Sequence, residues 1–157
     1  MAVKNIPLPR YVIRKIKKLW TLPFLAKQLN LSIMKQENLR GQLIGLDLVR
    51  RKLLLIRKVK DKFDCHIVDL QQVKHCSVKK VYTGIRVGDL QSKGLSHYLK
   101  SITLQLGFRS GDKPFTVTFY ESQSHTMKQQ SFLEQAAKKW ERFVSELLPK
   151  PEPVVLY

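Results

Sequence analysis

The sequence lacks the features that stabilise secreted proteins or anchor proteins across a membrane. Its 157 residues include two cysteines, too few for a disulfide framework, so the fold must rest on an ordinary hydrophobic core. The longest strongly apolar stretch near the N-terminus, Leu19 to Ala26, has eight residues and contains Pro23. A transmembrane helix needs about 20 apolar residues. We therefore expect a soluble, cytoplasmic chain made of one domain and an extension.

Recognised catalytic motifs are also missing. The chain contains no nucleophile elbow, P-loop, Rossmann fingerprint or paired-histidine metal motif. The glycine-bounded stretch 107–111 joins two strand candidates and has no helix after it that would bind phosphate. The 12 carboxylates are scattered along the chain rather than gathered in one region. We predict a protein that is not an enzyme, with no catalytic residues, no cofactor and no metal.

The two cysteines each stand next to a histidine, and together these four residues are a possible zinc ligand set. If the strands that carry them pair antiparallel, Cys65 faces Cys76 and His66 faces His75. The two pairs would then lie on opposite faces of the sheet and could not converge on one metal. We interpret the cysteines as half-buried packing residues with exposed histidines beside them.

Acidic residues are absent from the first part of the chain, where basic residues are concentrated. The formal net charge is +17, and no acid precedes Glu37. The eight basic residues of this segment supply about half of the net charge. They are Lys4, Arg10, Arg14, Lys15, Lys17, Lys18, Lys27 and Lys35.

Residues 10–20 predict a basic amphipathic helix. Apolar side chains from Val12 to Trp20 share one side of the helical wheel, between Pro9 and Pro23, which suit its two ends. Such a helix is attracted to an anionic membrane, whose interface takes the apolar face while the cations meet lipid phosphates. A helix packed on its own domain remains open as an alternative. The cations are Arg14, Lys15, Lys17 and Lys18.

From residue 42 onward the pattern is that of β-strands. Residues 42–48 and 52–57 predict a hairpin joined at Val49–Arg51, and residues 101–108 and 115–119 alternate and predict a second hairpin. Between the hairpins, two further strand candidates, 65–69 and 76–82, are expected to pair. A long connection follows over 83–100 and could contain another short strand.

The end of the chain predicts a helix over 131–148. Ser131 and Glu134 match a capping box at its start, and Pro149 ends it. The apolar residues occupy one broad side of the wheel, which must be buried against the strands. They are Phe132, Leu133, Ala136, Ala137, Trp140, Phe143, Val144, Leu147 and Leu148. A proline-rich tail, 149–157, follows.

Together these features resemble the pleckstrin-homology-like (PH-like) superfold, in particular its bacterial versions. The strand pair Leu43–Arg57, the later hairpin and the terminal helix follow its order of elements. Within "IVDLQQVKHCSV", Asp69, Leu70 and Val73 occupy the places of a D-L-x-x-V/I turn that is frequent in such domains.

The resemblance implies a fold that is mainly β with α. We expect an antiparallel barrel or sandwich of six to seven strands over 41–148, capped by the C-terminal helix and preceded by a basic helical extension over 1–40. Members of this superfold bind phosphoinositide headgroups, peptides or protein surfaces rather than catalyse reactions. Their inositide pattern, K-x(n)-[KR]-x-R, is met only partly at Arg50-Arg51-Lys52. We therefore expect a non-specific anionic-surface patch there.

We predict a non-enzymatic binding module at the inner face of a membrane, which contacts lipid phosphates, a protein partner or both. Two alternatives stay open. One is non-specific nucleic-acid binding, for which strong basic charge is the footprint. The other is a protein-interaction scaffold that self-associates as a homo-oligomer. The predicted surface residues are Arg14, Lys15, Lys17, Lys18, Trp20, Arg50, Arg51, Lys52, Lys58, Lys60 and Lys62.

Overall fold

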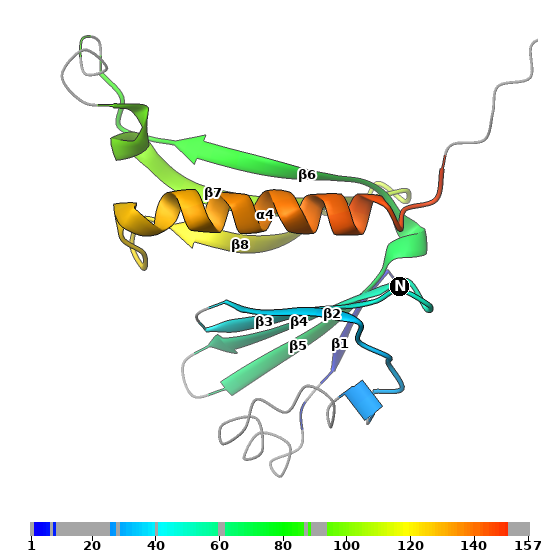
Figure 1. The fold of residues 1–157 in the computed structure, drawn as a ribbon. Coiled ribbons are helices and arrows are strands. Elements are labelled where there is room, and N and C mark those ends of the chain that lie inside the picture. Colours follow the sequence, from blue (N-terminus) through cyan, green and yellow to red (C-terminus); the bar gives the residue numbers. More distant parts are fainter. Residues whose placement is uncertain are drawn as a thin grey trace, which may run out of the picture. The chain divides into compact units, whose positions relative to one another are not determined.

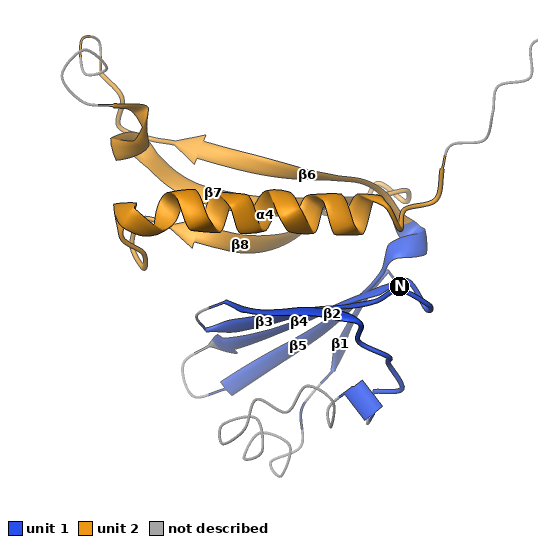
Figure 2. Cartoon of the chain, viewed as in Figure 1, with its two compact units in different colours: residues 1–72 blue, residues 73–157 orange. Residues whose placement is uncertain are grey.

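The chain consists of two compact units, residues 1–72 and 73–157 (Figure 2). The computed structural model describes residues 2–6, 8, 26, 27, 29–39, 41–59, 62–86, 88 and 94–150. Their secondary structure is mainly β with one C-terminal helix, which confirms the predicted class (Figure 1). The described strands form two separate antiparallel sheets and no closed barrel, because the chain changes sheet after residue 69.

Unit 1 is a five-stranded sheet with the order β1-β5-β4-β3-β2 (Figure 1). Four of its strands follow one another as antiparallel neighbours, and the first strand of the chain adds to the outer side of the last. The predicted first hairpin is confirmed as β3 and β4. The strands are β1 (Val3–Ile6), β2 (Lys35–Leu39), β3 (Gln42–Asp47), β4 (Lys52–Val59) and β5 (Lys62–Asp69).

The centre of this sheet is buried on both faces. Leu53 to Ile56 are at most 1% exposed, and this explains why β4 reads as a continuous apolar run without alternation. On one face, Ala26 and Leu31 from the segment before β2 pack over the sheet. The cluster there consists of Ala26, Leu31, Leu43, Leu54, Ile56, Phe63, Cys65 and Ile67.

Strands β1 and β2 lie within 1–40, where the sequence predicted only a helical extension. Neither has a strong strand signal. The sequence of β2, Lys-Gln-Glu-Asn-Leu, is polar, and β1 has four residues. Both are held by backbone pairing to stronger neighbours, β3 and β5, so the sheet begins well before the predicted boundary at residue 41.

Unit 2 is a three-stranded sheet with the order β6-β7-β8. The turn η1 (Leu70–Gln72) leads into β6 (Val73–Tyr82), and β7 (Leu99–Phe108) and β8 (Phe115–Glu121) form the predicted second hairpin. The excursion 83–100 contains the short turn η2 (Leu95–Tyr98). Its described residues hold no strand of their own, apart from the first two residues of β7.

Helix α4 (Gln130–Ser145) packs against all three strands of this sheet (Figure 1). Its buried apolar residues are Leu133, Ala136, Ala137, Trp140 and Val144. The Glu141 carboxylate accepts a hydrogen bond from the Val78 backbone N–H at 2.5 Å, so the helix also protects part of the exposed edge of β6. Glu134 forms ion pairs with Lys80 of β6 and with Lys138.

The start of α4 differs from the sequence prediction in two ways. The capping box is formed by Thr126 and Gln129 around the turn η3 (Met127–Gln129), because this turn leads into α4 and Ser131 is already the second residue of the helix. Phe132, predicted on the buried side, is 64% exposed, because a single sheet covers only a narrow strip of the helix. The tail beyond Lys150 lies outside the described residues.

Candidate anion-binding surface

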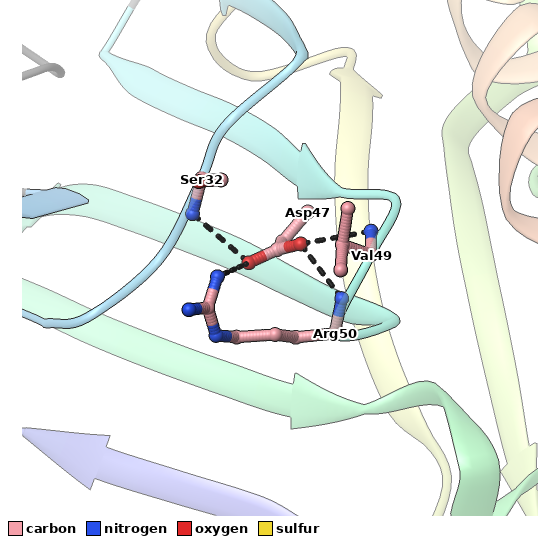
Figure 3. Close-up of polar contacts among 4 residues, drawn as sticks. All are labelled: Ser32, Asp47, Val49 and Arg50. Atoms are coloured by element: carbon pink, nitrogen blue, oxygen red, sulfur yellow. Dashed lines mark hydrogen bonds and ion pairs between the residues drawn. The ribbon is translucent and has the colours of Figure 1, made fainter.

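A buried carboxylate organises the turn between β3 and β4 (Figure 3). Asp47 is fully buried, and its Oδ1 accepts hydrogen bonds from the N–H groups of Val49 at 3.0 Å and Arg50 at 2.8 Å. Its Oδ2 accepts one from the Ser32 N–H at 2.9 Å and lies 3.4 Å from Arg50 Nη1. Burial alone would raise the pKa of Asp47, but the hydrogen bonds from Arg50 and Ser32 outweigh it and hold the pKa below its usual value.

This turn presents three consecutive cations, Arg50, Arg51 and Lys52. The Arg50 side chain is 43% exposed in spite of its ion pair, and Arg51 is exposed with a positive φ of 54°. Lys52 lies 4.0 Å from the Asp69 carboxylate. The Arg51 carbonyl accepts a hydrogen bond from the Leu70 N–H at 3.0 Å. The turn is therefore fixed by contacts on both sides while its positive side chains face solvent.

A shallow cavity of about 470 Å³ lies beside this turn. Lys27 and Arg50 both line it, together with polar side chains and the apolar residues of the 26–34 segment. Among the described residues, no Asp or Glu belongs to the lining, and the carboxylate of Asp47, which contacts Ser32 and Arg50 of the lining, is occupied by hydrogen bonds. Such a lining offers charged donors to an anion. Its polar members are Asn30, Ser32 and Gln36. We call Lys27, Arg50, Arg51 and Lys52 the turn cluster.

The other predicted cations of unit 1 lie elsewhere on the sheet. Lys58 and Lys62 flank the connection between β4 and β5, whereas the turn cluster lies at the start of β4. Lys58 lies six residues after Lys52 along β4, and at about 3.3 Å per residue this separates the two by roughly 20 Å. The structure therefore does not bring these two groups together. Arg14, Lys15, Lys17, Lys18, Trp20 and Lys60 lie outside the described residues.

A polar network that the sequence did not predict lies across β1, β5 and β4. His66 Nδ1 is 2.6 Å from Asn5 Oδ1, and His66 Nε2 is 3.2 Å from Arg57 Nη2. This geometry fits a neutral imidazole that donates from Nδ1 and accepts at Nε2. Burial, and then the positive charge of Arg57, lower the pKa of His66, although Asp64 opposes them. Only the alternation of polar Asp64 and His66 along β5 signals this polar face.

The pairing predicted for the two Cys-His dipeptides is wrong. The strand that carries Cys65 pairs with β4 and β1, and the strand that carries Cys76 pairs with β7, so the two lie in different sheets. Burial raises the pKa of each thiol to about 12, with Glu141 contributing at Cys76, so neither is a thiolate at neutral pH. Among the residues that the structure describes, no three His, Cys, Asp or Glu side chains are grouped to hold a metal.

Comparisons with known proteins do not assign the chain to a family. No protein-family model matches it, and neither the curated proteins nor the solved structures give a match. In the part of the chain that the structure describes, no helix combines the length and apolarity needed to cross a membrane.

Proposed function

We propose that this protein is a non-enzymatic binding module of PH-like type that associates peripherally with an anionic membrane surface. The turn cluster is the main contact among the described residues. The observation that carries the proposal is the cavity beside it, whose described lining residues include Lys27 and Arg50 and no acid.

The order of elements supports the PH-like part of the proposal. The meander β2 to β5 is followed by a second meander, β6 to β8, and then by the amphipathic helix α4. The PH-like superfold, which the chain resembles, has the same succession of strands and helix. Because that superfold serves binding in many different proteins, the ligand must be argued from charge and geometry.

Connectivity also supports an anionic partner for the turn cluster. Residues 9–25 contain five Lys or Arg and no acid, and they run directly into Ala26 and Lys27, which line the cavity. Basic residues near an anionic bilayer contribute about 1 kcal/mol each, and their effects combine when they meet the same surface. The basic segment and the turn cluster would therefore reinforce one another.

Co-sedimentation of the full chain with vesicles of phosphatidylcholine and phosphatidylserine in equal amounts tests this proposal. Lys27→Glu with Arg51→Glu should weaken binding at least about tenfold, since two attractive charges become repulsive. Lys58→Glu with Lys62→Glu changes the net charge equally at the far end of β4 and is the matched control. An equal loss in both variants would mean that net charge alone binds the vesicle, and the turn cluster would not be the site.

The N-terminal segment needs a substitution rather than a truncation. Removing residues 1–36 would delete β1 together with Ala26 and Leu31, which belong to the core of unit 1. Replacing four cations by glutamine leaves these residues in place and is expected to weaken vesicle binding further. The substituted residues are Arg14, Lys15, Lys17 and Lys18.

A further inference from the structure

Unit 2 exposes a group of large apolar side chains that do not contribute to its core. Five of the seven exposed large hydrophobic residues among the described positions belong to this unit. They are Val81 (44% exposed), Ile85 (42%), Leu95 (46%), Met127 (45%) and Phe132 (64%). Several exposed apolar side chains in one region mark an interaction surface more often than a scattered single one does.

All five come from segments that meet at the same end of unit 2. Strand β6 ends there, η2 leads into β7, and η3 leads into α4, as Figure 1 shows. The Gln130 side chain fixes this junction, because its Nε2 donates to the Ser96 carbonyl at 3.0 Å and to the Tyr120 hydroxyl at 2.9 Å. The Thr83 N–H donates to the Tyr98 carbonyl at 2.9 Å. We call Ile85, Leu95, Met127 and Phe132 the apolar end of unit 2. Val81 is not part of it, because Lys80 faces α4 through its ion pair with Glu134 and the next residue along β6 points to the other face of the sheet.

The exposure of Phe132 is fixed by the packing of the helix. Leu133, Ala136 and Trp140 on the neighbouring side of α4 are buried, so the helix cannot rotate to bury Phe132 without exposing them. Met127 and Leu95 belong to short helical turns with no buried residue. Long, flexible apolar side chains on such turns can enter a lipid interface without any change of fold.

The charges around this end are predominantly positive. Lys100 and Lys128 are exposed, and Arg86 directly follows Ile85. Of the nearby acids, Glu134 is bound by Lys80 and Lys138. Glu121 at the end of β8 is exposed, so three cations stand against one exposed carboxylate. Apolar side chains flanked by cations suit the interface of an anionic bilayer. There the apolar side chains enter the boundary of the acyl chains, and the cations contact the lipid phosphates.

We propose that the apolar end of unit 2 inserts Phe132, Met127 and Leu95 into the interface of an anionic membrane. This inference rests on the proposed function and adds to it a second contact that acts by apolar insertion as well as charge. Since salt screens the charges of the turn cluster but not apolar burial, the second contact keeps part of the binding at high ionic strength.

The test uses the full chain and the same equimolar phosphatidylcholine and phosphatidylserine vesicles. Phe132→Gln with Met127→Gln should weaken binding about tenfold at high salt, because apolar area no longer leaves water. Phe132→Leu keeps the apolar character and should bind like wild type. In a second measurement, Phe132→Trp should be quenched by lipids brominated in their acyl chains, over a wild-type background from Trp20 and Trp140.

The outcomes separate the two proposals. If wild type binds the vesicles but the glutamine variant binds equally and Phe132→Trp is not quenched, the insertion is refuted while the proposed function stands. If wild type does not bind these vesicles at all, both are refuted. If the glutamine substitutions abolish self-association in light scattering and leave vesicle binding intact, the apolar end is a contact between copies, and insertion is again refuted.

Discussion

The carboxylate of Asp47 accepts a hydrogen bond from the Ser32 backbone at 2.9 Å, although the two residues are 15 positions apart in the chain. The same carboxylate accepts two N–H groups from its own turn. Asp47 therefore connects the segment that lines the basic cavity to the turn that supplies Arg50 and Arg51. A single buried charge holds together the two parts of the candidate site.

Asp47→Asn should lower the free energy of unfolding by about 2 kcal/mol, because hydrogen bonds to a charged, buried acceptor contribute about 1.5–3 kcal/mol. Urea unfolding followed by circular dichroism measures the change. Asp112→Asn, which alters an exposed carboxylate in the turn between β7 and β8, should change stability by less than about 0.5 kcal/mol. Equal effects of the two substitutions would contradict the role given to Asp47.

His66 should make the protein less stable as the pH falls below neutrality. Its pKa is lowered in the folded state from an ordinary value of 6.5, so the unfolded chain takes up a proton first. The stability contributed by neutral His66 is complete above pH 6.5, and it decreases as the pH falls from there toward the pKa of the folded state. Urea midpoints measured between neutral and mildly acidic pH should show this slope in wild type. In His66→Gln the slope should be smaller over the same range.

Arg51→Gly should stabilise the fold and weaken vesicle binding at the same time. Arg51 has a φ of 54°, a conformation that glycine adopts without the steric cost of a Cβ, so a gain of about 0.5–1 kcal/mol is expected. Arg50→Gly is the matched comparison. Arg50 does not have positive φ and loses its ion pair with Asp47, so that variant should be destabilised. Thermal unfolding that gives both variants the same sign would contradict this reading.

Gly107→Ala should destabilise unit 2 by about 1 kcal/mol, which is at the lower end of the usual cost of adding a methyl group to a packed site. His75 lies directly opposite across β6 and β7, and a Cβ at position 107 would be 2.3 Å from its Cε1. The His75 side chain is exposed and has room to move, which limits the cost. In a His75→Ala background the penalty should become smaller, and a double-mutant cycle measures this coupling. A penalty that is unchanged in that background would exclude the contact as its cause.

The elements that could be predicted are those whose own residues carry the pattern. The hairpin of β7 and β8 was predicted because Ile102, Leu104 and Leu106 alternate with polar residues and are buried in the structure. Helix α4 was predicted because its apolar residues recur at helical spacing. In contrast, β1 and β2 are strands because they pair with β5 and β3, and their own residues carry no pattern that predicts this pairing.

Long-range pairing limited the prediction of the sites. His66 contacts Asn5 over 61 positions, and no sequence spacing indicates that β1 joins β5. Charge alone indicates Arg50, Arg51 and Lys52 as candidate site residues, whereas only the fold places Lys27 in the same cavity lining as Arg50. Phe132 was assigned to the buried face because a helical wheel does not show how wide a strip the sheet covers.

The central claim is attachment to an anionic membrane, and a competition between lipid and nucleic acid tests it most directly. The full chain is sedimented with vesicles of phosphatidylcholine and phosphatidylserine in equal amounts, with duplex DNA present at the same phosphate concentration. Vesicles of phosphatidylcholine alone are the control. We predict that the protein sediments with the anionic vesicles in the presence of DNA and stays in solution with the neutral ones. Retention by DNA in the supernatant, or equal sedimentation with both kinds of vesicle, would contradict the account.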